Sequence, residues 1–129
     1  ALVVTGSDGL DEITLAGASQ IIEVRGDRMT TKQVLPEDFG MATVPESELA
    51  GGNAIDNASE FLAIISGEGR KPIVDLVTLN AAYALTLVDR SYEIEPAIHI
   101  VKTALADGTV EAFFLKFREF VMANELAVK

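Results

Sequence analysis

The pattern of apolar and polar residues divides the chain into a β-rich first part and a helical remainder. Residues 1–6 form a short, continuous apolar run that ends at a glycine. Such a run predicts a strand that is covered on both faces, usually in a parallel sheet. A buried strand needs neighbours for its backbone groups, and no βαβ repeat follows to supply parallel ones. We therefore expect the chain to be the later part of a longer protein, although a processed product would have the same sequence.

A β-hairpin is predicted after this strand. Residues 20–25 and 28–34 are two β-rich runs separated by Gly26-Asp27, a glycine-led pair typical of a two-residue turn. Residues 10–17, before the hairpin, are compatible with either a helical turn or a strand. After the hairpin, residues 35–46 contain two prolines and predict turns and a linker.

The apolar spacing changes to three and four residues from about residue 53, which predicts α-helices. The second helix is apolar around its whole circumference, as central helices are. The last carries a stripe of Phe113, Phe117, Phe120 and Val121, for which we expect core packing, with a partner surface as the alternative. Four helices are expected, over about residues 53–66, 72–90, 95–107 and 109–125.

The fold class that follows is α/β. We expect the C-terminal portion of a mostly parallel-sheet domain, comprising a buried strand, a β-hairpin and about four helices. The 129 residues are enough for one domain, and 49% hydrophobic and 23% charged residues are ordinary globular values.

Composition and charge exclude several functions. With 20 acidic and 10 basic residues the net charge is -10, which repels phosphate backbones and anionic lipid heads. We therefore expect no nucleic-acid and no membrane partner, and the longest uncharged stretch, residues 76–88, is too short to span a bilayer. The absence of cysteine excludes disulfides, thiolate zinc sites and cysteine nucleophiles, and fits a reducing compartment.

The densest polar cluster, Ser7-Asp8-Gly9-Leu10-Asp11-Glu12, directly follows the first predicted strand. Ligands of open parallel sheets bind beyond the carboxyl ends of strands, so this position favours a function. Carboxylates such as Asp11 and Glu12 suit Mg²⁺, which takes one or two protein carboxylates and completes its shell with water and substrate phosphate. The residue types alone favour a simpler alternative, a solvated acidic loop that caps a helical turn.

Two other sequence features give weaker support for a functional site. Asp38-Phe39-Gly40 resembles a kinase magnesium motif, but no kinase catalytic loop or glycine-rich phosphate loop accompanies it. The single histidine, His99, has no cysteine to join it in a catalytic or metal site, and we interpret it as structural.

Taken together, residues 1–13 resemble a segment of anthranilate phosphoribosyltransferases, in the nucleoside phosphorylase and phosphoribosyltransferase superfamily. The similarity continues, in family order and spacing, through residues 36–40, Gly51-Gly52 followed by Asn57-Ala58, and residues 79–85. One departure is Thr5, where many relatives have His, and we assign Thr5 no role. The resemblance implies that residues 1–129 are the C-terminal part of the phosphoribosyltransferase α/β domain. In the family a helical domain and the glycine-rich phosphate loop lie upstream.

The resemblance also implies a reaction. Members of this family transfer phosphoribosyl from phosphoribosyl pyrophosphate to anthranilate, giving N-phosphoribosyl-anthranilate and pyrophosphate in tryptophan biosynthesis. They use Mg²⁺ held partly by an adjacent Asp and Glu, which correspond to Asp11 and Glu12, with Asp8 as a candidate supporting residue. The implied partners are the two substrates, phosphoribosyl pyrophosphate and anthranilate. The resemblance also implies that the complete protein is a homodimer in the cytoplasm.

The family's phosphate loop and anthranilate-orienting arginine lie upstream, so we expect the 129 residues alone to lack transferase activity. Two alternatives stay open. A non-catalytic binding relative of the same fold would be expected to lack the acidic pair and to have a basic surface. A pyrimidine nucleoside phosphorylase relative would share the architecture, but the later segments of that family do not match.

Overall fold

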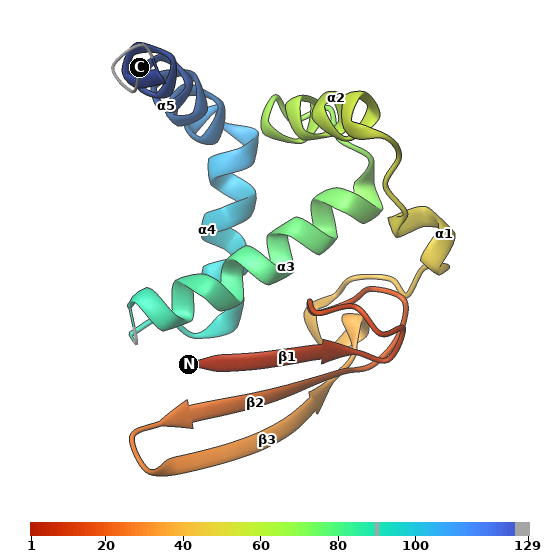
Figure 1. Ribbon diagram of the computed structural model, residues 1–129. Helices are drawn as coiled ribbons and strands as arrows, with labels where there is room; N and C mark the ends of the chain where they lie inside the picture. Colours follow the sequence, from red (N-terminus) through yellow and green to blue (C-terminus); the bar gives the residue numbers. More distant parts are fainter. Residues whose placement is uncertain (90, 126–129) are drawn as a thin grey trace.

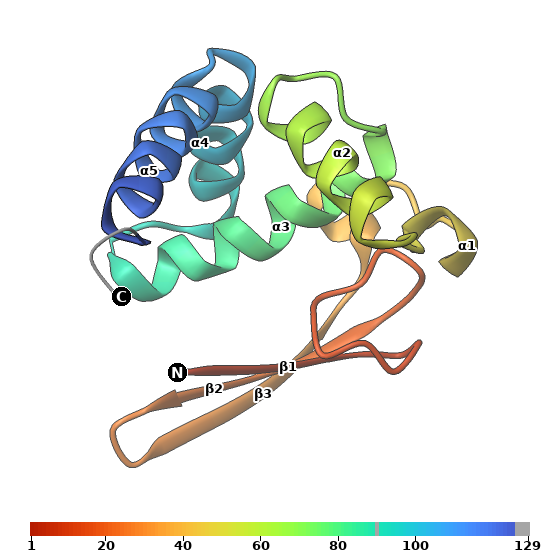
Figure 2. The same ribbon diagram turned by 45° about the horizontal axis from the view of Figure 1, so that its top comes forward.

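The computed structural model describes residues 1–89 and 91–125. All five α-helices lie on one side of a three-stranded sheet (Figures 1 and 2). The opposite face of the sheet is not covered by any helix of the described residues. In chain order the elements are β1 (Leu2–Gly6), β2 (Ser19–Arg25), β3 (Arg28–Val34), the 3₁₀ helix η1 (Pro36–Phe39), α1 (Glu46–Leu49), α2 (Ala54–Ile65), α3 (Lys71–Val88), α4 (Ile94–Ala106) and α5 (Thr109–Glu125).

The sheet is antiparallel, with strand order β1-β2-β3. The α/β class and the hairpin are confirmed, and Gly26 takes the left-handed φ of 58° that its turn requires. The buried strand and the mostly parallel sheet are not found in the described residues. Val4 of β1 packs toward the core, whereas Val3 is 54% exposed on the uncovered face. A continuous apolar run shows neither the direction of a strand nor which segments cover its two faces, because both depend on pairing and packing with distant residues.

Helix α3 is the centre of the molecule, as its apolar circumference predicted. It lies across the helical face of the sheet (Figure 2), and its Leu79, Ala82 and Tyr83 are buried in one core with Ile13 and Ile21. Of the described helices, only α3 is long and apolar enough to cross a membrane by length and composition, and 28% of it is buried here. A central core helix passes the same test, and α3 fills that place.

The predicted helix boundaries are close to those observed. Asn53 caps α2, its Oδ1 accepting from the backbone N–H groups of Ile55 and Asp56 at 2.9 and 3.1 Å. The predicted end of the second helix, Arg90, lies outside the described residues. The short helix α1 was missed, because four residues after a proline carry too little periodicity to distinguish a helical turn from a linker.

The aromatic stripe of α5 is on the surface, so the expectation of core packing is wrong for the described residues. Phe113, Phe117 and Phe120 are 69%, 53% and 66% exposed. The ring that does pack inward is Phe114, which meets Phe61 of α2 with ring centroids 4.9 Å apart. Periodicity identified an apolar face of α5 but could not show which segment covers it.

Candidate functional site

The acidic pair lies in the loop that joins β1 to β2. Asp11 and Glu12 are exposed, whereas Ile13, Thr14 and Leu15, which follow them directly, are each 1% exposed. This stretch, ambiguous between helix and strand in the sequence, is neither, and runs through bends. The chain therefore passes from solvent into the core within one residue of Glu12.

Asp8 orders the side of the loop that precedes the pair. Its Oδ1 accepts from the backbone N–H of Leu10 at 3.1 Å, and its Oδ2 accepts from the hydroxyl of Thr14. The backbone N–H of Gly6 also donates to the carbonyl of Leu10 at 2.9 Å. Both carboxylate oxygens of Asp8 thus have partners inside the loop, which gives Asp8 a structural task beside the acidic pair.

Asn80, from the middle of α3, holds the side of the loop that follows the pair. The backbone N–H of Ile13 donates to Asn80 Oδ1 at 3.0 Å, and Asn80 Nδ2 donates to the carbonyl of Ile13 at 2.9 Å. Asn80 Nδ2 also donates to the carbonyl of Leu76 at 3.0 Å. Asn80 lies within residues 79–85, one of the segments that carry the family resemblance, but no local pattern in the sequence indicates this contact.

Glu12 lines a groove of about 840 Å³ between the acidic loop and the helices. Its other walls come from α1, the Gly51-Gly52 segment, α2 and the first half of α3. Polar groups on these walls are Asp56, Asn57, Glu60 and Arg70. The groove therefore carries both acidic and basic side chains, and Glu12, one of the two predicted magnesium ligands, lines it.

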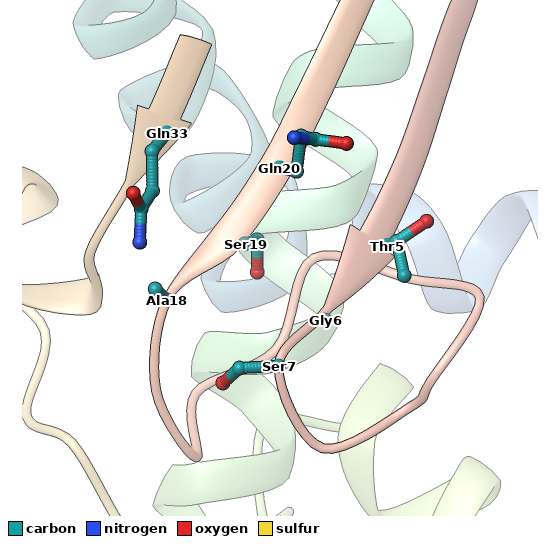
Figure 3. A pocket seen from close by; sticks show the side chains of 7 residues that line it. All are labelled: Thr5, Gly6, Ser7, Ala18, Ser19, Gln20 and Gln33. Carbon is teal, nitrogen blue, oxygen red and sulfur yellow. The ribbon is translucent and has the colours of Figure 1, made fainter.

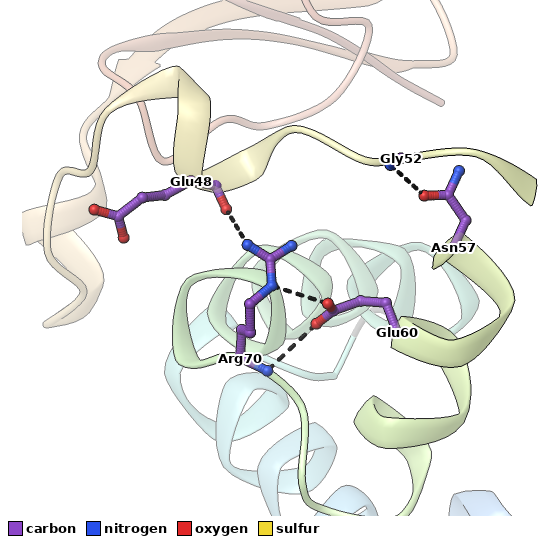
Figure 4. A network of polar contacts seen from close by, with 5 residues as sticks. All are labelled: Glu48, Gly52, Asn57, Glu60 and Arg70. Atoms are coloured by element: carbon purple, nitrogen blue, oxygen red, sulfur yellow. Dashed lines mark hydrogen bonds and ion pairs between the residues drawn. The ribbon is translucent and has the colours of Figure 1, made fainter. Parts of the chain in front are cut away.

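An ion-pair network supports the far wall of the groove (Figure 4). Arg70 Nε lies 2.8 Å from Glu60 Oε2, and Arg70 Nη1 donates to the carbonyl of Glu48 at 3.1 Å. The hydrogen bond from the Arg70 side chain lowers the pKa of Glu60 below its usual value. Through one guanidinium, the start of α3 is tied to both α1 and α2.

The Gly51-Gly52 segment lies directly against the start of α2, so a side chain at either position would have to displace Asn57 or Asp56. The N–H of Gly52 donates to Asn57 Oδ1 at 2.7 Å (Figure 4). A Cβ at Gly51 would lie 2.8 Å from Asn57 Oδ1, and one at Gly52 would lie 2.7 Å from Asp56 Oδ2. Gly51 and Gly52 belong to the residues that carry the family resemblance, but their close approach to α2 is visible only in the structure.

A second hollow, of about 330 Å³, lies where β1 ends (Figure 3). Thr5, Gln20 and Gln33 line it in a row because they are paired across the three strands. Ser7 and Ser19 complete its polar lining, which contains no charged side chain. Thr5, to which the sequence assigned no role, is thus part of a neutral polar surface beside the acidic loop.

The donor chemistry at Asp11 and Glu12 fits magnesium. Among residues 1–89 and 91–125, no group of three or more Asp, Glu, His or Cys side chains is arranged to hold a metal ion. Two exposed carboxylates are nevertheless a usual protein contribution to a Mg²⁺ shell, in which water and phosphate supply the other oxygens. The residues present therefore suit an ion that arrives with a phosphate ligand.

The two other sequence candidates lie apart from this chemistry. Asp38 Oδ2 accepts from the backbone N–H of Leu35 at 2.8 Å, so Asp38 closes the first turn of η1. His99 is exposed on α4 and does not contribute to the core.

Three comparisons place the chain among known proteins. The anthranilate phosphoribosyltransferase of Brevibacillus brevis is 44% identical over 108 residues, which are 84% of this chain and 31% of that protein. The crystal structure of the Thermus thermophilus anthranilate phosphoribosyltransferase superposes with a TM-score of 0.84 at 26% identity, over 95% of this chain and 36% of that one. A Saccharomyces cerevisiae anthranilate phosphoribosyltransferase, in complex with PRPP and Mg, has a TM-score of 0.76 at 23% identity, over 86% and 32%.

The resemblance seen in the sequence is thus confirmed. The chain spans about a third of the length of the curated relatives that it matches. The family model described as "Glycosyl transferase family, a/b domain" matches residues 1–111. Because this match takes in the sheet, the acidic loop and α1 to α4, the chain belongs to the glycosyl transferase family that is defined by this α/β domain.

Proposed function

We propose that the complete protein is an anthranilate phosphoribosyltransferase. It would transfer phosphoribosyl from phosphoribosyl pyrophosphate to anthranilate, giving N-phosphoribosyl-anthranilate and pyrophosphate in tryptophan biosynthesis. The observation that supports the proposal most is the exposed pair Asp11-Glu12, held by hydrogen bonds on both sides, of which Glu12 lines a groove, in a chain of this family. The yeast relative with PRPP and Mg bound supports the choice of substrate and ion.

In this reaction the bond between ribose C1 and the pyrophosphate oxygen breaks, and pyrophosphate leaves with the electron pair. A bond forms between C1 and the anthranilate nitrogen, which loses a proton to solvent. Bound magnesium would supply the positive charge that offsets charge building on the pyrophosphate. The task of Asp11 and Glu12 is to hold that ion at a fixed place. Exposure serves this task, because the remaining ligand positions must be open to water and phosphate.

The complete protein supplies the remaining parts of the site in this proposal. We propose that residues 1–129 are the C-terminal part of its α/β domain, with the helical domain and phosphate loop in preceding segments. The exposed phenylalanines of α5 and the exposed Val3, Val24 and Met29 of the sheet support this, because further segments or a second copy would cover these apolar side chains. We also propose a cytoplasmic homodimer, and no transferase activity for the 129 residues alone.

The test is the double variant Asp11→Asn with Glu12→Gln in the complete protein. Both substitutions keep side-chain size and remove charge, so the fold should be unchanged by circular dichroism. We expect kcat at saturating substrates to fall by about 10²–10³, as when a preorganised electrostatic group is lost. The rate should also lose its normal dependence on magnesium concentration.

The matched control is Glu111→Gln with Glu119→Gln, which makes the same charge change at two exposed positions of α5. It should retain the parent rate and magnesium dependence. Parent-like magnesium dependence in the Asp11 and Glu12 variant would show that the ion is held elsewhere. Absence of anthranilate turnover in the parent protein would exclude the proposed reaction.

A further inference from the structure

Asn80 contacts the backbone immediately beside the acidic pair. Its side-chain oxygen accepts from the N–H of Ile13 at 3.0 Å and its amide nitrogen donates to the carbonyl of the same residue at 2.9 Å. An Asn side chain has one acceptor and two donors, so it can pair with a peptide in both directions, as a neighbouring strand does. Two bonds to one residue fix the orientation of the backbone as well as its position.

The loop needs such a partner because it has no strand neighbour at this point. Ile13 is 1% exposed, and a buried backbone N–H or carbonyl without a partner is costly. Asn80 is itself fixed by its bond to the carbonyl of Leu76, one turn earlier in α3. The side chain therefore connects a rigid central helix to the irregular backbone one residue after Glu12.

The two acidic residues thus lie between two backbone positions that hydrogen bonds hold in place, which are the two anchors of the pair. On one side Leu10 is held by Gly6 N–H and by Asp8. On the other side Ile13 is held by Asn80. Only Asp11 and Glu12 lie between, so the two anchors limit the directions in which their carboxylates can extend.

We propose that Asn80 is a positioning residue that sets the geometry of the Asp11-Glu12 pair for a divalent ion. This inference rests on the proposed function, in which the pair holds magnesium. Asn80 is not proposed as a ligand of the ion, because both of its bonds to the loop are to the backbone of Ile13. Supporting residues behind metal ligands commonly change metal affinity by 10- to 100-fold when they are replaced, because ligand orientation is lost.

The test uses the complete protein with saturating phosphoribosyl pyrophosphate and Mn²⁺ in place of Mg²⁺, with bound ion measured by electron paramagnetic resonance. Asn80→Ala removes all three hydrogen bonds. Asn80→Asp keeps the volume and the acceptor for Ile13 N–H but loses both donated bonds. We expect Mn²⁺ binding to weaken about tenfold or more in both variants. If Asn80→Ala does not fold, Asn80→Asp carries the test.

A control on the same helix is Thr86→Ala, which removes a hydrogen bond from Thr86 Oγ1 to the carbonyl of Tyr83 away from the loop. It should bind Mn²⁺ like the parent. The inference is overturned if both Asn80 variants bind Mn²⁺ like the parent while the Asp11→Asn, Glu12→Gln variant does not. If that acidic-pair variant also binds like the parent, the proposed metal role fails first, and the role of Asn80 fails with it.

Discussion

Phe39 meets Tyr83 edge to face, with ring centroids 5.9 Å apart and ring planes at 89°. This contact joins η1, which follows the sheet, to the central helix α3. Lys32 of β3 lies over the Tyr83 ring, its Nζ 5.2 Å from the centroid, so the ring also contacts a strand. The Tyr83 hydroxyl is buried, however, and has no hydrogen-bond partner among the described residues. The packing of the ring therefore stabilises the fold, whereas burial of the hydroxyl without a hydrogen bond lowers stability.

Burial raises the pKa of Tyr83 to about 12 from an ordinary value of 10, with smaller effects from the charges of Glu95 and Asp38. Below pH 10 the phenol is neutral in both states, so its ionisation does not affect stability there. Above pH 10 the Tyr83 phenol ionises in the unfolded chain before it does in the folded protein, so the free energy of unfolding falls as pH rises to about 12. The expected loss is about 2–3 kcal/mol. Tyr83→Phe should remove this component and leave stability at neutral pH equal or higher.

Urea unfolding of the complete protein at neutral pH and at several alkaline values measures this effect. The control is Tyr92→Phe, which removes a tyrosine that is 39% exposed. Because lysines titrate in the same range, the difference between the two variants is the informative quantity. An equal alkaline loss in both variants would show that the buried phenol is not the cause.

The parts of this fold that the sequence predicted depend on neighbouring residues. The glycine-led turn of the hairpin, the start of a helix near residue 53 and the apolar circumference of α3 are local patterns, and the structure has all three. The pairing of β1 is not local, because an apolar run fits a parallel or an antiparallel neighbour equally well. The exposure of Phe113 likewise depends on what lies opposite it.

The candidate site divides in the same way. Asp11 and Glu12 could be proposed from residue type, position and resemblance, because ligand chemistry belongs to the side chains themselves. Asp8, three residues before Asp11, could also be named as a supporting residue, but the second anchor could not, since Asn80 lies 67 residues from Ile13 in the chain. An asparagine inside an apolar helix indicates that some polar partner exists, but only the packed structure identifies it.

The cap of α2 offers a direct test of local stability. Asn53→Ala removes the acceptor for the N–H groups of Ile55 and Asp56 at the helix start. We expect the free energy of unfolding of the complete protein to fall by about 1 kcal/mol, the usual cost of losing such a cap. Ser59→Ala, in the same helix and exposed, should change stability by less than about 0.5 kcal/mol. Similar values for the two variants in urea unfolding would contradict the capping role.

Gly6→Ala should disturb the acidic loop from within. An added Cβ would lie 2.3 Å from Asp8 Oδ1 and 2.9 Å from Thr14 Cγ2, so Asp8 must move and release the buried Thr14 hydroxyl. We expect a loss of about 1–3 kcal/mol in stability together with weaker Mn²⁺ binding. Gly26→Ala is the matched control, because an alanine at φ 58° costs about 1–2 kcal/mol but meets no atom within 4 Å and lies in the hairpin turn. The Gly26→Ala variant should lose stability and bind Mn²⁺ like the parent. If Gly6→Ala also binds Mn²⁺ like the parent, the geometry of the acidic loop does not depend on Asp8.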